Sequence, residues 1–366
     1  MKVICQGSEL SDALSKVIRA LPVKKTTPIL DGVKISAAGD TLTLFATDAE
    51  LSIEKKINAE VLIEGDFVVP GKLFAEYARK LENERLELAV NDGKKLVIKY
   101  LDSVLNINGY GADEYPVFKD VSKEHSFVIM KKELKDLINK IIFCVATEDT
   151  RPALKGCCLS VKSDYIEGVS SDGFRLALSK KMIKNNGVTE NIVVPAKSLL
   201  ELGKLMDDED ESVSVYVEKN SIMVDLFHTK LVSRLIAETY MSYEKIIQVE
   251  SESEVTIDKK VFESAMDRVA LISRGSKDNN VTFDIREDCM TLSAESDDGV
   301  ISEKIPVSLK GRDVSARFNS RYIGDCMKTV DDEYLTFNFS KSTSPLIVKG
   351  SNYGWLHLIL PLRVIN

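Results

Sequence analysis

The segment TPILDG at Thr27–Gly32 has a counterpart 124 residues further along the chain, RPALKG at Arg151–Gly156. Proline, leucine and glycine occupy the same places in both segments. A helical pattern precedes each copy at the same offset, opening with Glu-Leu at 9–10 and again at 133–134. Matches in the same order at one fixed distance predict that the chain is built from similar units.

The repeat extends beyond these segments and includes a third, more diverged copy. ATD at 46–48 returns as SSD at 170–172, and FVVPGKL at 67–73 is echoed by IVVPAKSL at 192–199, one residue out of register. The third copy begins near Asp258–Phe262, passes Ser296–Gly299 and reaches Arg317–Tyr322. The 366 residues therefore divide into three units of about 122 residues each.

Inside each unit the pattern of apolar residues repeats as a helix followed by short strands. Leu10, Leu14 and Val17 have helical spacing, whereas 42–46 and 86–90 alternate with the period of a strand. Turn signals separate the strands: Ala38–Asp40, Asn91–Gly93, Asn185–Gly187 and Asp298–Gly299. The predicted fold class is α+β, with six helix-plus-strands halves in three similar domains at 1–122, 126–248 and 254–366.

The composition is that of a packed protein of the cytoplasm. Hydrophobic residues make up 44% and charged residues 29%, which supports a core and excludes disorder or a coiled-coil rod. The six cysteines are scattered without a C-x-x-C pair, as expected for reduced thiols. No leader-like apolar segment opens the chain, and no apolar run approaches the ~18 residues of a membrane span. We therefore expect neither secretion nor membrane insertion.

Basic residues recur on the predicted helices although 49 Lys and Arg against 57 Asp and Glu give a net charge of −8. They are Lys16, Arg19, Lys72, Arg79, Lys80, Lys131, Lys132, Lys135, Lys140, Lys197, Lys204, Lys259, Lys260, Arg268, Arg321 and Lys328. One interpretation is a solvated helix face with i,i+4 ion pairs. The other, which recurrence in three repeats favours, is a surface that binds duplex DNA through its phosphates without reading bases.

No helix-turn-helix, zinc-finger or RNA-binding signature accompanies these residues, so sequence-specific recognition is disfavoured. Two further phosphate contacts are predicted in loops, from the pair Lys24 and Lys25 and from Arg151 in the second unit. The predicted DNA-binding residues are Lys24, Lys25, Lys132, Arg151, Lys197 and Arg268.

The ordered motifs resemble the bacterial beta sliding clamp family, the processivity subunit of the replicative DNA polymerase. The resemblance runs essentially from end to end and rests on these segments: Thr27–Leu30, Ala46–Asp48, Val68–Pro70, Arg151–Gly156, Ser171–Ala177, Phe318–Tyr322 and Leu360–Arg363. It implies a head-to-tail homodimer in which six similar domains close a ring around duplex DNA. Topology would then hold the protein on DNA, and a basic lining would let it slide at any sequence.

The resemblance also implies a pocket between the second and third domains that receives short linear motifs of polymerase, clamp loader and repair proteins. The matching positions are Leu154, Ser171, Gly173, Phe174, Arg175, Leu176, Met241, Ile246, Asn319, Tyr322, Leu360, Pro361, Leu362 and Arg363. Apolar walls with a few polar groups suit a short peptide, and Arg175 would hold a peptide carbonyl or carboxylate. Phe174, Met241, Leu360 and Leu362 differ from many relatives, which leaves the preferred partner motif open.

The ring seam implied by the family combines apolar contacts with opposite charges at the rim. Its predicted residues are Lys72, Lys99, Leu105, Ile107, Leu271, Ile272, Asp297 and Asp298.

Few residues of the chain fit a known catalytic motif. The three histidines, His125, His228 and His357, have no H-E-x-x-H motif and no cysteine at metal-binding spacing. Gly65–Leu73 imitates a phosphate loop, but its spacing is wrong and Leu73 replaces the Ser or Thr that would hold magnesium. Asp48 and Asp172 recur at equivalent places, which indicates turns rather than acid–base pairs. We therefore expect no enzyme, no cofactor and no metal; a peptide-binding adaptor without DNA is the alternative, and a hydrolase a distant third.

Overall fold

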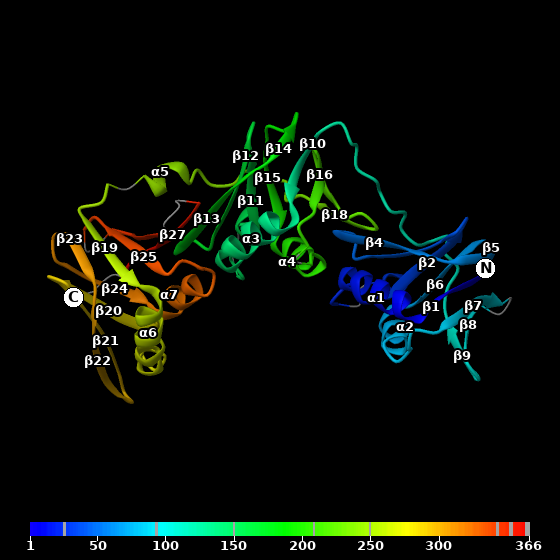
Figure 1. Cartoon of the computed structure of the whole chain (residues 1–366), viewed down its shortest axis with the longest axis horizontal. Helices are drawn as coiled ribbons and strands as arrows, with labels where there is room; N and C mark the ends of the chain where they lie inside the picture. The colour runs from blue at the N-terminus through cyan, green and yellow to red at the C-terminus, as the bar shows by residue number, and fades with distance from the viewer. Residues whose placement is uncertain are drawn as a thin grey trace. The chain divides into compact units, whose positions relative to one another are not determined.

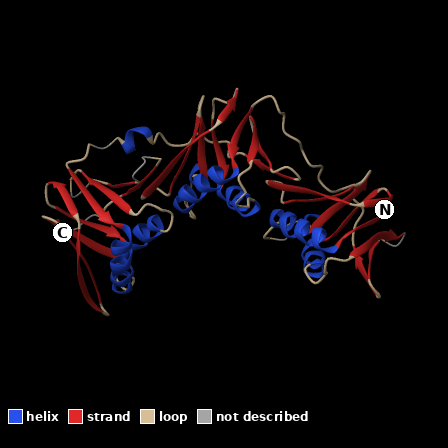
Figure 2. Cartoon of the chain, in the orientation of Figure 1, coloured by secondary structure: helices blue, strands red, loops and turns tan. Residues whose placement is uncertain are grey.

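The computed structural model describes residues 1–24, 27–91, 94–148, 151–207, 209–248, 250–341, 344–350 and 354–362. Within them a strand, a helix and three more strands follow one another six times, which confirms the α+β class (Figures 1 and 2). The helices are α1 (Gly7–Val17), α2 (Gly71–Ala78), α3 (Lys131–Ile141), α4 (Ala196–Leu205), α6 (Lys259–Ser273) and α7 (Ser320–Met327), with the short α5 (Glu244–Ile247) in a connection. None of the described helices is long and apolar enough to cross a membrane.

The strands follow the same order in each half. The first and second halves contain β1 (Lys2–Gln6), β2 (Gly32–Ala38), β3 (Thr41–Thr47), β4 (Leu51–Asn58), β5 (Glu60–Ile63), β6 (Gly65–Pro70), β7 (Arg85–Asn91), β8 (Lys95–Tyr100) and β9 (Ser103–Asn108). The third and fourth contain β10 (Ser126–Met130), β11 (Gly156–Val161), β12 (Tyr165–Ser171), β13 (Arg175–Met182), β14 (Lys184–Asn186), β15 (Asn191–Pro195), β16 (Ser212–Glu218), β17 (Ser221–Asp225) and β18 (Thr229–Arg234). The fifth and sixth contain β19 (Ser253–Asp258), β20 (Asn280–Arg286), β21 (Cys289–Ser296), β22 (Gly299–Pro306), β23 (Ser308–Gly311), β24 (Val314–Asn319), β25 (Tyr334–Phe339), β26 (Leu346–Lys349) and β27 (Trp355–Ile359).

The chain forms two compact units. The N-terminal unit comprises Met1–Lys132, Lys184–Val188 and Glu201–Leu235. It holds a five-stranded sheet, β5-β1-β7-β8-β9, and a nine-stranded sheet, β14-β10-β16-β17-β18-β4-β3-β2-β6. The nine-stranded sheet joins two repeats because β18 pairs antiparallel with β4, and each is the last long strand of its half.

The C-terminal unit also contains a sheet that joins two repeats. It comprises Glu133–Ile183, Thr189–Leu200 and Ile236–Asn366. Its sheets are β15-β11-β12-β13-β27-β26-β25-β19-β23, with nine strands, and β22-β21-β20-β24, with four. Here β13 pairs antiparallel with β27, again the last long strands of two halves. The two remaining last strands, β9 and β22, lie at sheet edges among the described residues.

The segments that revealed the repeat form the same local structure twice. In each, proline begins a one-turn 3-10 helix, at Pro28–Asp31 and Pro152–Lys155, and glycine begins the next strand. A β-carbon on Gly32 would collide with Val68, and one on Gly156 with the carbonyl of Val194. Glycine recurs because β2 and β11 approach the neighbouring strands, β6 and β15, too closely for a side chain.

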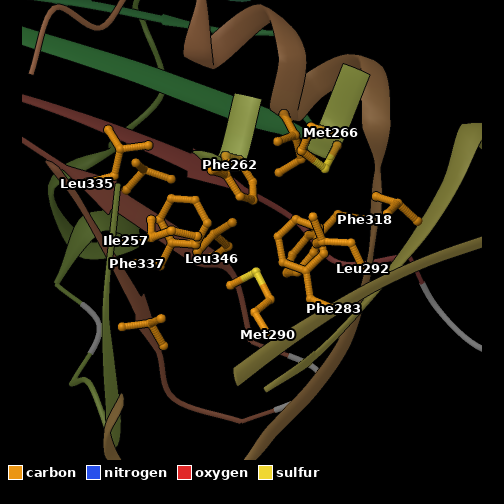
Figure 3. Close-up of a cluster of buried hydrophobic side chains, with 14 of the residues drawn as sticks. Ile257, Phe262, Met266, Phe283, Met290, Leu292, Phe318, Leu335, Phe337 and Leu346 are labelled. Atoms are coloured by element: carbon orange, nitrogen blue, oxygen red, sulfur yellow. The ribbon is translucent and has the colours of Figure 1, made fainter. Parts of the chain in front are cut away.

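Aromatic side chains fill the core of the third repeat. Phe262 of α6, Phe283 of β20 and Phe337 of β25 are fully buried, and the rings of Phe262 and Phe337 meet edge to face with centroids 5.0 Å apart (Figure 3). Each such side chain contributes about 1.5–3 kcal/mol by leaving water. Asp258 fixes the start of α6, since its Oδ1 accepts a hydrogen bond of 2.9 Å from Val261 N. The core therefore holds α6 against the sheets.

The turn predicted at Asn185–Gly187 lies later in the chain than the sequence indicates. Asn185 and Asn186 belong to the short strand β14, which pairs with β10, and not to a turn. The chain reverses at Gly187, which has a φ of +81°, while the amide of Asn185 bonds both to N and to O of Val188. Asparagine side chains commonly hydrogen-bond to the nearby backbone in turns, which is why the sequence predicts the turn at the two asparagines themselves. Part of the signal at Asn91–Gly93 lies outside the described residues.

Candidate functional site

The segment Ser171–Leu176, here called the pocket loop, connects β12 to β13 in the C-terminal unit. Oδ1 of Asp172 accepts hydrogen bonds from N of Phe174 (2.9 Å) and N of Arg175 (3.0 Å), while Gly173 takes a left-handed φ of +91°. Ser171 Oγ donates to the carbonyl of Arg175 at 2.7 Å. The loop is thus a tight turn that lifts Phe174 out of the sheet.

The equivalent turn of the first repeat is built in the same way. Oδ1 of Asp48 accepts from N of Glu50 (3.0 Å) and N of Leu51 (2.7 Å), and Ala49 takes a φ of +75°. The interpretation of both aspartates as turn residues is confirmed.

Arg175 is the centre of the polar wall, although its donors point into the protein. The residue is 8% exposed. Its Nε donates to Asp172 Oδ2 (2.9 Å), Nη1 to Asp325 Oδ2 (2.9 Å) and Nη2 to the carbonyl of Phe143 (3.1 Å). The guanidinium carbon also lies 4.4 Å from the centre of the Tyr322 ring. These hydrogen bonds tie the pocket loop to α7, and the expectation that Arg175 holds a peptide carbonyl or carboxylate stays a prediction.

The apolar floor beside this wall comes from strands of two repeats. Leu176 of β13 packs in a buried cluster, against which Met241 lies half-buried. The cluster comprises Cys158, Val169, Leu176, Leu178, Tyr243, Ile347 and Leu358. Predicted residue Leu154 is buried in the turn that precedes β11. This cluster is apolar and lies beside the predicted pocket residues Leu176 and Met241.

Three of the predicted pocket residues carry exposed apolar side chains. Phe174 is 61% and Leu360 38% exposed, and Ile246 is also exposed. The segments that carry Phe174 and Leu360 adjoin, because N of Leu360 donates to the carbonyl of Phe174 at 2.9 Å. Leu362 continues along β24 through a hydrogen bond of 2.8 Å to the carbonyl of Arg317. Phe174 and Leu360 are therefore neighbouring apolar side chains that are exposed to water, although such side chains are usually buried.

The other predicted pocket residues support the backbone. Asn319 caps α7, since its Oδ1 accepts from N of Arg321 at 2.9 Å, and its amide donates to the carbonyl of Asp278. Tyr322 lies half-buried under Arg175, and Pro361 is half-buried beside Leu360. Arg363 lies outside the described residues.

A buried Cys–His pair lies behind this wall, which the sequence spacing did not reveal. Cys326 Sγ lies 2.7 Å from Nδ1 of His357, and Nε2 of His357 lies 3.1 Å from the carbonyl of Lys140. Burial lowers the pKa of His357 to about 3, despite the hydrogen bond to Lys140, and burial raises the pKa of the Cys326 thiol. Both groups are therefore neutral near pH 7, so the pair joins α7 to β27 instead of forming a reactive thiolate.

This buried histidine gives a pH-dependent stability. The folded protein keeps His357 neutral down to about pH 3, whereas the unfolded chain binds a proton below about pH 6.5. The unfolded state thus binds more protons in this window, and stability falls as the pH falls through it. We expect the free energy of unfolding to lose about 1.4 kcal/mol from this residue between about pH 7.5 and about pH 5.5. Urea unfolding followed by fluorescence of the single tryptophan, Trp355, measures it.

The matched variants are His357→Asn and, at an exposed histidine, His228→Asn. The first should remove this part of the pH dependence and the second should leave it. An identical pH dependence in all three proteins would contradict the assignment.

The predicted DNA-binding residues lie in different environments. Lys24 and Lys132 are exposed, Lys197 is half-buried, and Lys25 lies outside the described residues. Arg268 is exposed but forms two hydrogen bonds of 2.6 Å to the carboxylate of Glu303. The guanidinium of Arg151 lies against the pocket loop.

Much of the wider basic set is paired within the chain. Five of these residues form surface ion pairs: Lys16–Asp12, Arg19–Glu201, Lys204–Glu201, Lys259–Glu263 and Lys328–Asp325. Lys131 and Lys140 are buried, the first beside Asp207 and Glu211 and the second beside Asp136. The prediction that all these lysines point from the free helix faces is therefore wrong for these two, whose carboxylate partners draw them inward.

The predicted seam residues divide into exposed and structural ones. Lys72, Lys99, Leu271, Asp297 and Asp298 are exposed, and Lys99 Nζ lies 3.0 Å from Glu87 Oε1. Leu105 is half-buried in β9.

Two predicted seam residues support the core of their own domains. Ile107 is buried in β9, and Ile272 packs against the core of the third repeat. Two further apolar residues are exposed on the edge strands, Val104 of β9 and Val300 of β22. In the sequence, both residues are apolar at positions of edge strands that point outward.

Three family models match the chain in order: the DNA polymerase III beta subunit N-terminal domain at residues 1–119, its central domain at 128–241 and its C-terminal domain at 244–363. The chain belongs to the DNA polymerase III beta subunit family. Proteins named "Beta sliding clamp" from Halalkalibacterium halodurans and Staphylococcus epidermidis are 30% and 28% identical to it, over 96% of both chains in each case. The crystal structure of the DNA polymerase sliding clamp from Bacillus subtilis, 28% identical, matches with a TM-score of 0.96 over 100% of this chain and 99% of that one.

Proposed function

We propose that this beta subunit is a sliding clamp: a head-to-tail homodimer that encircles duplex DNA and tethers the replicative polymerase, the clamp loader and repair proteins through its peptide pocket. The observation that carries the proposal is the pairing rule of the sheets. Last long strands pair antiparallel at both junctions between repeats, β18 with β4 and β13 with β27. Only β9 and β22 remain at edges among the described strands of this kind, and both carry exposed apolar side chains. An exposed apolar edge is a ready template for pairing.

The same rule supports a closed dimer. If β9 of one chain pairs with β22 of a second, the second chain's β9 meets the first chain's β22, and both edges are satisfied. Such a head-to-tail contact closes when the rotation completes a ring. The seam of the proposal comprises Lys72, Lys99, Leu105, Leu271, Asp297 and Asp298, with Ile107 and Ile272 supporting it from beneath. Domains at 1–122, 126–248 and 254–366 then supply the six parts of the ring.

The proposal assigns binding rather than catalysis to the chain. Phosphate contacts are assigned to Lys24, Lys25, Lys132, Arg151, Lys197 and Arg268, and partner motifs to the pocket around Leu176, Phe174 and Leu360. Retention by topology needs little affinity, which accords with an acidic protein whose helix lysines are largely paired. We infer that the protein works in the cytoplasm, on chromosomal DNA, and is not itself an enzyme.

Retention on DNA tests the proposal. Labelled protein is loaded with a clamp loader onto nicked circular duplex and onto the same duplex after it has been cut into linear form. We expect a half-life on circles at least about tenfold longer than on linear DNA, because a topological link is lost only through an open end. Equal half-lives on both substrates would contradict the clamp function.

The paired lysines favour a second candidate, a peptide-binding adaptor that needs no DNA. The variant Lys132→Gln/Lys197→Gln separates the two, since it removes charge from the first turns of α3 and α4. A clamp should load onto circles less well in this variant and bind peptides as before. An adaptor should show no association with circular DNA in either protein.

A further inference from the structure

A groove between α6 and α7 forms a cavity of about 540 Å³ in the third repeat (Figure 1). The end of α6 lies beside the start of α7, because the hydroxyl oxygens of Ser273 and Ser320 are 2.7 Å apart. Pockets that bind small molecules typically measure about 300–1,000 Å³. The groove, here called the α6–α7 groove, is therefore large enough to hold a small ligand.

Gly324 keeps the middle of the groove open. Glycine inside a helix destabilises it relative to alanine, and Gly324 lies within α7. Its φ is not left-handed, and a β-carbon placed on it would meet no atom of the described chain within 4 Å. Neither the backbone nor a close neighbour therefore requires glycine here. The residue leaves free space in the groove at a cost to the helix that carries it.

Two arginines without partners stand at one end of the groove. Arg274 and Arg321 line the cavity, and each directly follows one of the two bonded serines. Both are exposed, and neither side chain forms a hydrogen bond or an ion pair with the residues that the structure describes. The first turn of α7 adds the positive end of a helix dipole. This end suits an anion with several oxygens, such as a pyrophosphate.

A buried hydroxyl proton is available at the same end. Only one hydroxyl of the pair Ser273–Ser320 donates to the other, so the second proton has no acceptor among the described residues. Ser273 is fully buried, and Ser320 is 4% exposed and lines the cavity. A buried donor without an acceptor costs free energy. When Ser273 donates to Ser320, an anion between the arginines would accept the proton of Ser320.

The other end of the groove carries negative charge. Glu263 and Asp267 line it from α6, and Asp267 precedes Arg274 by seven residues, which is about 10 Å along the helix axis. Lys328 also lines this end, but its Nζ lies 3.3 Å from Oδ1 of Asp325. Carboxylates repel phosphates and accept hydrogen bonds from amino groups. A duplex, which carries phosphates along its whole length, is therefore disfavoured as the ligand of this groove.

We propose that the α6–α7 groove is a binding site for a nucleoside diphosphate. The pyrophosphate lies between Arg274 and Arg321, and the base lies over Met266 and Met327, which are buried in the floor of the cavity. Thioether sulfurs make favourable contacts with aromatic rings. An exocyclic amino group of the base, as in adenine or cytosine, donates to Asp267. The site goes beyond the proposed function and does not rest on it.

Isothermal titration calorimetry of the full chain tests the assignment, with ADP, CDP, UDP and pyrophosphate as probes. We expect CDP to bind at least about fivefold more tightly than UDP, whose base places an oxygen where cytosine has its amino group. Pyrophosphate should bind more weakly than ADP. Arg274→Ala and Arg321→Ala should each weaken ADP binding by about tenfold, since each removes a charge-assisted hydrogen bond. Asp267→Asn should abolish the difference between CDP and UDP.

Gly324→Leu tests the groove without unfolding the protein. Leucine favours a helix over glycine, and its β-carbon has free space, so stability should not fall while the side chain fills the groove and abolishes ADP binding. The matched control is Arg317→Ala, at an exposed arginine of β24 outside the groove, which should bind ADP as the wild type does.

Three results would overturn the assignment. The first is a wild type that binds no ADP, and the second is equal affinity for ADP and pyrophosphate, which would leave an anion site without a place for the base. The third is an Arg274→Ala variant that binds ADP as before but loads less well onto circular DNA, which would make Arg274 a contact to DNA. Failure of the clamp function would not affect the calorimetry, because no DNA is present in it.

Discussion

Replacing Leu271 with aspartate is expected to convert the dimer into monomers and to abolish retention on circular DNA. Leu271 is 67% exposed near the end of α6, so the folded chain loses little when it becomes polar. In the proposed dimer it is covered at both seams. Burying a carboxylate in place of a leucine costs about 2 kcal/mol per seam, hence about 4 kcal/mol for the ring. This corresponds to roughly a thousandfold rise in the Kd of the dimer.

Analytical ultracentrifugation over a range of protein concentrations measures this change, and loading on nicked circles measures its consequence. The matched control is Leu62→Asp, which places the same charge at a leucine 49% exposed on β5, the opposite edge of the N-terminal five-stranded sheet. This control should remain dimeric. Dimers of unchanged affinity in Leu271→Asp would show that α6 does not contribute to the seam.

Ile272 is a poor choice for the same experiment, although it follows Leu271 directly. It is half-buried and packs against the core of the third repeat, so a charge there would unfold the domain rather than open the seam. Sequence alone gave both residues the same role. Only the packing distinguishes a side chain that is exposed to solvent, such as Leu271, from one that faces its own core, such as Ile272.

The sequence predicted best those features that depend on the backbone. Gly32 and Gly156 indicated the repeat. Close strand pairing excludes a side chain at both positions, so glycine is required at the equivalent place in each of the two units. The aspartates at 48 and 172 marked equivalent turns for a similar reason. Backbone geometry that depends on neighbouring residues requires particular residue types at fixed positions. This is why three repeats and the α+β class could be predicted without a structure.

Interactions between distant residues left no such signature. Lys140 has the spacing of an exposed helix residue, yet it is buried, with Asp136 beside it and Asp331 reaching it from far along the chain. Burial disfavours the ionised form of Asp136, but the ammonium groups of Lys140 and Lys181 prevail and lower its pKa. Cys326 and His357 likewise become a pair only through the fold. Helical periodicity cannot show that a charge is drawn inward by carboxylates from another repeat.

Replacing Arg175 with methionine is expected to lower the free energy of unfolding by about 2–3 kcal/mol, because it leaves the half-buried carboxylate of Asp172 without this partner and leaves Asp325 only its exposed ion pair with Lys328. Methionine fills much of the same volume, so the loss reflects the charges rather than a cavity. Peptide binding should weaken as well, since the pocket loop is then no longer tied to α7. Urea unfolding monitored through Trp355, together with anisotropy of the bound peptides, measures both effects.

The surface pair Arg312–Glu252 provides the control, because Arg312→Met removes a guanidinium from an exposed carboxylate and should cost less than about 1 kcal/mol. A second comparison isolates the link to α7. In an Asp325→Asn background, Arg175→Met should cost less than in the wild type, by about 1–2 kcal/mol, since one of the two carboxylates that pair with Arg175 has already been removed. If Arg175→Met unfolded at the same urea concentration as the wild type and yet failed to bind peptides, Arg175 would have to contact the partner directly. Its hydrogen bonds to the two aspartates would then be a resting state that the peptide replaces.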